Sequence, residues 1–158
     1  MQKPIKRHES LIPLSRDHHH GLLLSWKIRT GEKKGISTQR MYSYANYFFN
    51  SQLVPHFRLE EDNVFPLLGA EDPLVKQALK EHRELENLFT KENGTGEDLT
   101  AIANLLEQHI RFEERILFTE IQDRAGEEAL MNIEKMENGI NTPNPDDWND
   151  KFWLKDMV

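Results

Sequence analysis

Apolar residues recur every three or four positions along almost the whole chain, which is the spacing of one face of an α-helix. Glycine and proline residues fall between these periodic stretches and mark their ends. The pattern predicts helices over residues 15–30, 37–68, 72–94 and 97–124, and a shorter helix over residues 127–138. No segment shows the sustained alternation of a strand. Four main helices with short connections predict an all-α fold, an up-down antiparallel four-helix bundle.

Several helix ends carry their own signals. Ser15 is the expected N-cap of the first helix, and Pro73 occupies the first position of the third. Pro55 and Pro66 fall inside the second helix. Because each lacks a backbone N–H, they predict a kink or an early end there.

The chain has 158 residues, the size of one domain. We expect residues 1–125 to form the bundle and residues 126–158 to form a short helix and an irregular tail that packs on the same domain. The large aromatic residues Trp148, Phe152 and Trp153 lie in that tail and favour its docking.

One motif occurs twice. His56 is followed by glutamates four and five positions later, and His109 is followed by glutamates at the same offsets. Both copies also share an arginine at the second position after the histidine and a phenylalanine at the ninth. Two copies indicate two similar helices within one bundle. In each copy the histidine and the first glutamate, Glu60 or Glu113, lie one turn apart on the same face and can reach one metal centre.

Four histidines lie on apolar stripes, one in each main helix, and they are His18, His56, His82 and His109. In the run of three histidines on the first helix, His18 is favoured because Leu14 lies one turn before it, and His19 is the alternative. Two bare carboxylates buried beside these histidines would cost several kcal/mol each unless they were paired or bound a cation. The pattern therefore predicts a metal site, and metal-free histidine–glutamate pairing is the alternative.

Composition narrows the chemistry. The net charge of −7 argues against a broad basic surface for nucleic acid. No apolar run is long enough to span a membrane, and the first five residues lack a signal core, so we expect no membrane partner and a cytoplasmic location. The absence of cysteine removes disulfides, thiolate catalysis and thiolate-bound metals. Any metal must then be held by nitrogen and oxygen, which suits Fe, Mn, Zn or Co.

Two glutamates among four histidines suggest two ions bridged by carboxylates, each with open coordination positions. Open positions favour redox chemistry or binding of small molecules over a closed structural site. A glutamate three residues before a metal-binding histidine is part of the ferritin-like di-iron motif. The four histidines here are preceded at that offset by Ser15, Leu53, Leu79 and Leu106, which argues against that arrangement.

The chain resembles the hemerythrin-like family, the HHE cation-binding domains, over roughly residues 10–124. The resemblance lies in an acid–histidine pair on the first helix, a second such pair on the third, and the two repeated motifs: Asp17-His18, Glu81-His82, His56/Glu60/Glu61 and His109/Glu113/Glu114. It implies a hemerythrin-like up-down bundle with an oxygen-bridged non-haem di-iron centre. The implied ligands are His18, His56, Glu60, His82, His109 and Glu113, with Glu60 and Glu113 bridging.

The chain departs from the oxygen-carrying members of that family at two positions. Ala78 stands where they have a fifth histidine, one turn before His82, and Glu113 replaces an aspartate that they carry one residue later. These differences predict fewer nitrogen ligands and more room at the centre. Glu86, Glu61, Tyr44 and Tyr47 are the alternatives for completing the coordination.

Three hypotheses for the function follow. In the first, the protein holds two iron ions, with Zn or Mn as substitutes, and binds or senses dioxygen or nitric oxide, or handles iron. In the second, the same centre is that of a redox enzyme acting on peroxide or nitric oxide. In the third, the bundle is metal-free and its aromatic tail docks another chain.

Overall fold

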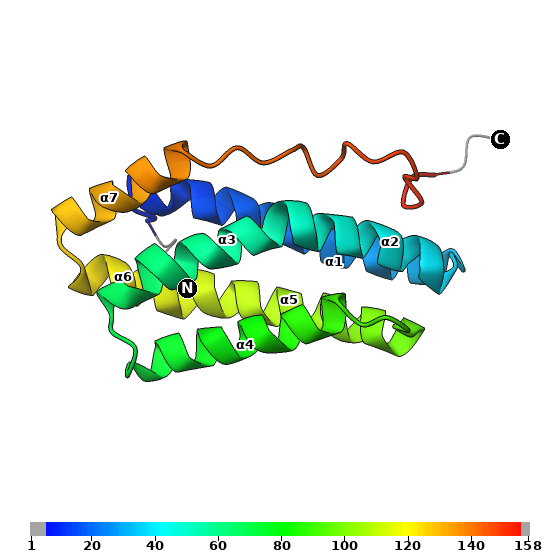
Figure 1. Ribbon diagram of the computed structural model, residues 1–158, viewed down its shortest axis with the longest axis horizontal. Coiled ribbons are helices and arrows are strands. Elements are labelled where there is room, and N and C mark those ends of the chain that lie inside the picture. Colours follow the sequence, from blue (N-terminus) through cyan, green and yellow to red (C-terminus); the bar gives the residue numbers. More distant parts are fainter. Residues whose placement is uncertain (1–5, 156–158) are drawn as a thin grey trace.

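The computed structural model describes residues 6–155, and this part of the chain contains helices and no strand (Figure 1). The prediction of an all-α fold is confirmed. The α-helices are α1 (Ile12–Lys33), α2 (Thr38–Phe48), α3 (Val54–Leu59), α4 (Pro73–Phe89), α5 (Gly96–Phe112), α6 (Phe118–Arg124) and α7 (Glu127–Asn138). Short 3-10 turns are η1 (Glu9–Leu11) and η4 (Phe65–Leu67), and π-helical turns are η2 (Phe49–Leu53), η3 (Glu60–Val64) and η5 (Glu113–Leu117). The first five residues, expected to lack a signal core, lie outside the described part.

Helix α1 begins earlier than its sequence predicts. The expected N-cap Ser15 lies inside the helix, which starts at Ile12 directly after the 3-10 turn η1. Pro13 is compatible with this start because the first turn of a helix needs no N–H donor. At the other end the chain turns through Gly35, whose φ of 71° favours glycine.

Residues 38–67 form one nearly continuous helical rod, α2–η2–α3–η3–η4. Ser37 caps its start by accepting a hydrogen bond from the Arg40 N–H. Pro55 does not end the rod. A π-turn precedes each proline, η2 before Pro55 and η3 before Pro66, and the wider turn accommodates the missing donor.

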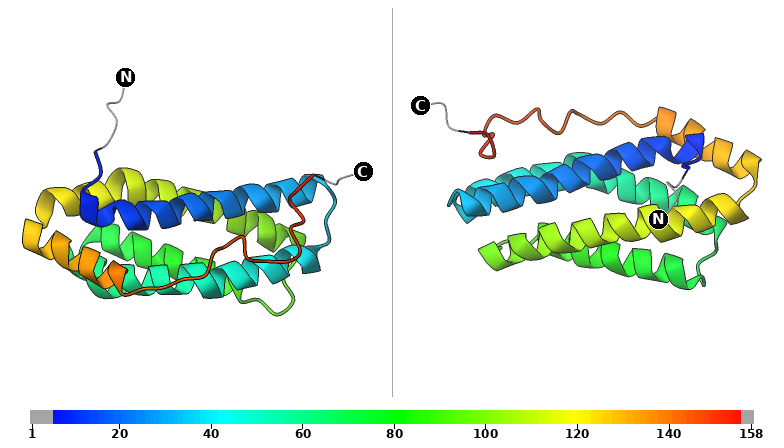
Figure 2. Two further views of the ribbon diagram at one scale, coloured as in Figure 1. Left: turned by 90° about the horizontal axis from the view of Figure 1, so that it is seen from above. Right: turned by 180° about the vertical axis from the view of Figure 1, so that it is seen from behind.

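The third and fourth rods are α4 and α5–η5–α6. Asp72 caps α4 through the Leu74 N–H, and Thr95 with Asp98 forms a capping box at the start of α5. The four rods lie side by side in both views of Figure 2. Helices α1 and α5 approach closely at Gly21, where an added Cβ would lie 2.7 Å from Ile110 Cδ1.

The apolar core consists of two clusters, one on each side of a polar layer. The first cluster includes Leu24 in α1 and Leu85 in α4, and the second includes Leu14 in α1 and Ala78 in α4. The histidines His18 and His82 follow Leu14 and Ala78 by one turn, so the polar layer interrupts the apolar stripe of each rod at the same level.

The segment after α7 runs back along the bundle (Figure 1). Trp153 and Phe152 are buried, and both rings pack on Tyr44. The buried ammonium of Lys27 donates to Asp146 at 2.7 Å and lies 4.1 Å from the centre of the Trp153 ring. Gly31 leaves room for Phe152, whose ring would lie 2.9 Å from an added Cβ. The boundary at residues 125/126 stays a prediction.

In residues 6–155, none of the helices is both long and apolar enough to span a membrane.

We predict that Phe152→Ala lowers the free energy of unfolding by about 3 kcal/mol, because it removes a buried aromatic side chain. Urea denaturation followed by circular dichroism measures this change. Leu154→Ala is the matched control, since Leu154 is 53% exposed. Equal effects of the two substitutions would contradict the docking of this segment.

Candidate metal centre

Six polar side chains converge in the layer between the two apolar clusters, and each residue is at most 4% exposed. They are His18 in α1, His56 in α3, Glu60 in η3, His82 in α4, His109 in α5 and Glu113 in η5. These are the six candidate ligands of the sequence, and the structure brings all of them together.

The repeated motif has the same local geometry in both rods. His56 Nε2 lies 3.1 Å from Glu60 Oε1, and His109 Nε2 lies 2.6 Å from Glu113 Oε1, each one turn further along. Both rods change from α- to π-helix at the glutamate. A π-turn shifts the register of the side chains that follow it, and such turns are frequent at functional sites.

The six residues form two overlapping groups. In the first, His18 and His56 meet Glu60 and Glu113, and in the second, His82 and His109 meet the same two glutamates. Within each group the donor atoms lie within 4.8 Å of one another. The two glutamates therefore connect two adjacent positions, each of which could hold a metal ion.

The donor atoms that face the centre lack hydrogen-bond partners. This holds for Nε2 of all four histidines and for both carboxylate oxygens of Glu60 and Glu113. The close approaches between them fall outside hydrogen-bond geometry, as at the 3.3 Å between His82 Nε2 and Glu60 Oε1. Buried carboxylates without partners are costly, and a cation relieves that cost while using nitrogen and oxygen donors. The donor set therefore fits a metal.

The other ring nitrogen of each histidine is held by a carboxylate. The Nδ1 atoms of His18, His82 and His109 lie 2.7 Å from Glu114, Glu61 and Glu81, and that of His56 lies 3.0 Å from Asp17. An Nδ1–H that donates to a carboxylate leaves the Nε2 lone pair directed at the centre and raises its basicity.

These contacts have an internal symmetry. Glu61 and Glu114, the second glutamates of the two repeats, reach the histidines of α4 and α1. Asp17 and Glu81, which precede His18 and His82, reach the histidines of the two repeats. The sequence offered Glu61 as one alternative for completing the coordination, and it gave no individual role to Asp17, Glu81 or Glu114. The acid directly before each of those histidines was the available signal.

Charge is unevenly distributed within the cluster. Burial and then repulsion from Glu113 raise the pKa of Glu60 to about 8. Burial also opposes ionisation of Glu113, but the charge of His109 holds the pKa of Glu113 well below its usual range. Burial lowers the pKa of His109, yet attraction to Glu113 and the contact with Glu81 outweigh burial and raise that pKa to about 10. Without a cation the cluster therefore retains protons, which an incoming cation must displace.

The other candidates lie away from the cluster. His19 is exposed, and Glu86 pairs with Arg83 on the surface. The hydroxyls of Tyr44 and Tyr47 donate to backbone carbonyls of the C-terminal segment. Ala78, one turn before His82, is buried in the second apolar cluster.

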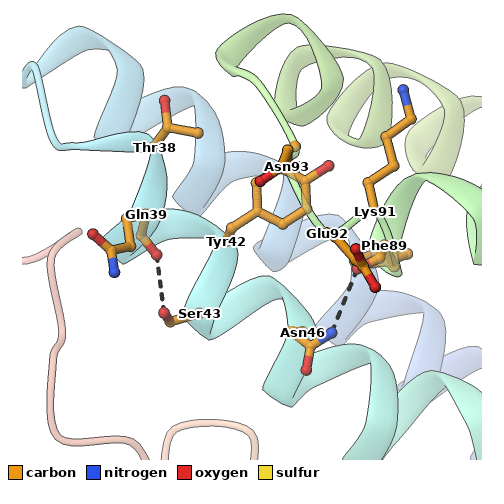
Figure 3. Close-up of a pocket in the computed structure, with 10 residues that line it drawn as sticks. Thr38, Gln39, Tyr42, Ser43, Asn46, Phe89, Lys91, Glu92 and Asn93 are labelled. Atoms are coloured by element: carbon orange, nitrogen blue, oxygen red, sulfur yellow. Dashed lines mark hydrogen bonds between the residues drawn. The ribbon is translucent and has the colours of Figure 1, made fainter.

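A wide groove of about 720 Å³ lies between α2 and the connection from α4 to α5 (Figure 3). Its side chains include Tyr42, Asn46 and Lys91, and Asn46 donates to the Phe89 carbonyl. None of the six buried residues lines it.

The fold and the site together define a class of protein. It is a helical protein with a buried histidine–carboxylate cluster that could hold a cation. The chain belongs to the hemerythrin family, since residues 12–121 match the Hemerythrin HHE cation binding domain. That span contains the six clustered residues and the four carboxylates that hold them. No curated protein and no solved structure matches the chain.

We predict that Glu81→Ala weakens metal binding by about 10- to 100-fold, because His109 loses the carboxylate that orients its ring. Titration with Co²⁺, followed by visible absorbance, measures the affinity. Glu84→Ala on the same helix is the control, since Glu84 is exposed and pairs with Lys80 at 3.9 Å. An unchanged affinity of the Glu81 variant would show that this contact does not support the site.

Proposed function

We propose that the protein binds two iron ions in a carboxylate-bridged centre within a hemerythrin-like up-down four-helix bundle. The observation that carries the proposal is the pair of overlapping donor groups that share Glu60 and Glu113. His18 and His56 would hold one ion, and His82 and His109 the other. Imidazole and carboxylate donors suit iron, and Zn or Mn are possible substitutes.

The role that this donor set supports best is binding or sensing of a small ligand such as dioxygen or nitric oxide, or the handling of iron. Two histidines and two shared carboxylates leave coordination positions open on each ion. When bound, the iron pair supplies a redox-active position for such a ligand. The chain itself contributes orientation through the four Nδ1–carboxylate contacts, and its apolar clusters keep bulk water from the site.

The first test is the metal content of untagged protein after anaerobic loading with Fe(II), measured by mass spectrometry. We expect about two iron atoms per chain, one for each donor group. Peroxide or nitric oxide consumption above that of free iron would favour the redox enzyme, whereas saturable binding without turnover would favour the ligand-binding protein. A chain that takes up no metal would overturn the proposal.

A cytoplasmic location and the absence of nucleic-acid and membrane partners stay predictions.

Substitution of a shared glutamate tests the bridging role. We predict that Glu60→Ala or Glu113→Ala loses far more metal than Glu61→Ala, because each shared glutamate belongs to both groups and Glu61 reaches His82 through Nδ1 alone. Metal content per chain after dialysis gives the comparison. Equal losses would contradict the assignment of Glu60 and Glu113 as bridges.

Metal affinity should rise with pH. Protons compete for the same donors, and the raised pKa values of Glu60 and His109 extend that competition to neutral pH and above. We expect occupancy to be clearly lower at roughly pH 5 than at roughly pH 7.5, on either side of the pKa of a free histidine. Binding titrations in buffers of different ionisation enthalpy would also detect proton release. Equal occupancy at both pH values would mean that histidines are not ligands.

A further inference from the structure

A small cavity adjoins the buried cluster beside His56. Its volume is about 140 Å³, and its walls come from α1, from the rod that contains α3, and from the end of α7 with the residues that follow. His56, Asp17, Gln52, Glu137, Ile140 and Thr142 are among its lining residues. In the left view of Figure 2 the end of α7 lies beside the rod that contains α3. A bound water occupies about 30 Å³ of liquid volume, so the cavity has room for an ion with several waters.

The cavity contains a carboxyl whose oxygens are buried, that of Glu137. Both carboxylate oxygens of Glu137 are buried and lack hydrogen-bond partners. Burial and then repulsion from Asp17 raise the pKa of Glu137 to about 8 and outweigh the attraction of His56. The amide nitrogen of Gln52 is already bound to the Pro143 carbonyl at 2.5 Å. The lining therefore includes the carboxyls of Glu137 and Asp17, which attract cations and repel anions when they are ionised.

The ring of His56 lies between the cavity and the centre, and His56 is the one clustered residue that lines the cavity. The Nδ1 atom of His56 meets Asp17, and its Nε2 atom faces the buried cluster. The Asp17 side chain is 48% exposed, against 27%, 19% and 11% for Glu114, Glu61 and Glu81 at the other three histidines. Of the four histidine–carboxylate pairs, this one is the most open to solvent.

The outer wall of the cavity is built from the C-terminal part of the chain. Glu137, Ile140 and Thr142 all follow residue 121, where the match to the HHE domain ends. Asp17 and His56 lie within that domain. The carboxyl of Glu137 is thus added to the domain by the segment that packs over it.

We propose that this cavity is the entrance through which divalent cations reach the buried cluster, with Glu137 and Asp17 as the carboxylates that bind the ion on its way. The inference rests on the proposed metal-binding function. Ionised carboxylates at an entrance raise the local concentration of cations and so the rate of their entry, and Glu137 acts in this way once an arriving cation displaces its proton. Glu137 contributes to the rate of loading, whereas the six clustered residues determine how much metal is retained.

The test is the rate at which metal-free protein takes up Co²⁺, followed by stopped-flow absorbance. We expect Glu137→Gln to slow loading by about ten-fold, with the final Co²⁺ content per chain unchanged. Glu128→Gln is the matched control, because it makes the same carboxyl-to-amide substitution at an exposed position in the first turn of α7. Its rate should equal that of the wild type.

A second variant separates charge from access. Ile140→Trp enlarges a side chain at the cavity wall without changing charge, and it should also slow loading while leaving the final content unchanged. If both variants took up Co²⁺ at the wild-type rate, the proposal that this cavity is the entrance would be overturned. A lower final Co²⁺ content per chain at an unchanged loading rate would also overturn it. Failure of the wild-type protein itself to take up Co²⁺ or Fe(II) would instead overturn the proposed function.

Discussion

The structure depends on the burial of two carboxyl groups at the centre of the bundle. Glu60 and Glu113 are fully buried, and their oxygens find no hydrogen-bond partner among the described residues. Two such groups in an apolar interior are destabilising unless a proton or a cation compensates them. In the metal-free state His109, whose pKa is raised to about 10, supplies a proton beside Glu113, and all four imidazoles offer nitrogen donors for a metal. Stability and binding capacity therefore rest on the same six side chains.

The contacts around this centre make it rigid without adding a further metal donor to the centre. Each imidazole is fixed through Nδ1 by a carboxylate from a different rod, so that the polar layer connects all four rods. The apolar clusters on either side exclude water from it. Orientation by outer carboxylates is a known way to increase the basicity of the facing nitrogen. The same residues thus support the fold and tune the candidate ligands.

The C-terminal segment packs along the outside of the bundle. Trp153 and Phe152 anchor it on Tyr44, and Gly31 allows the close approach. Before that anchor, the segment contributes Ile140 and Thr142 to the cavity beside His56, next to Glu137 at the end of α7. Docking of the aromatic residues therefore affects which side chains stand between solvent and His56. In the proposed route, access to the centre depends on a part of the chain that supplies none of the clustered residues.

Helical periodicity was sufficient to predict the all-α fold and the convergence of histidines such as His18 and His109, because a residue on an apolar stripe must face the interior wherever its helix packs. Local patterns were less reliable at helix ends: Ser15 is not a cap, and Pro55 does not end its rod, because a preceding 3-10 turn and a π-turn change the local hydrogen bonding. Only the tertiary structure decided that Asp17 and Glu81 hold histidines of other rods, and that Glu137 faces His56. Those contacts join residues far apart in the sequence, and their geometry depends on how the rods pack and not on the spacing within any one of them.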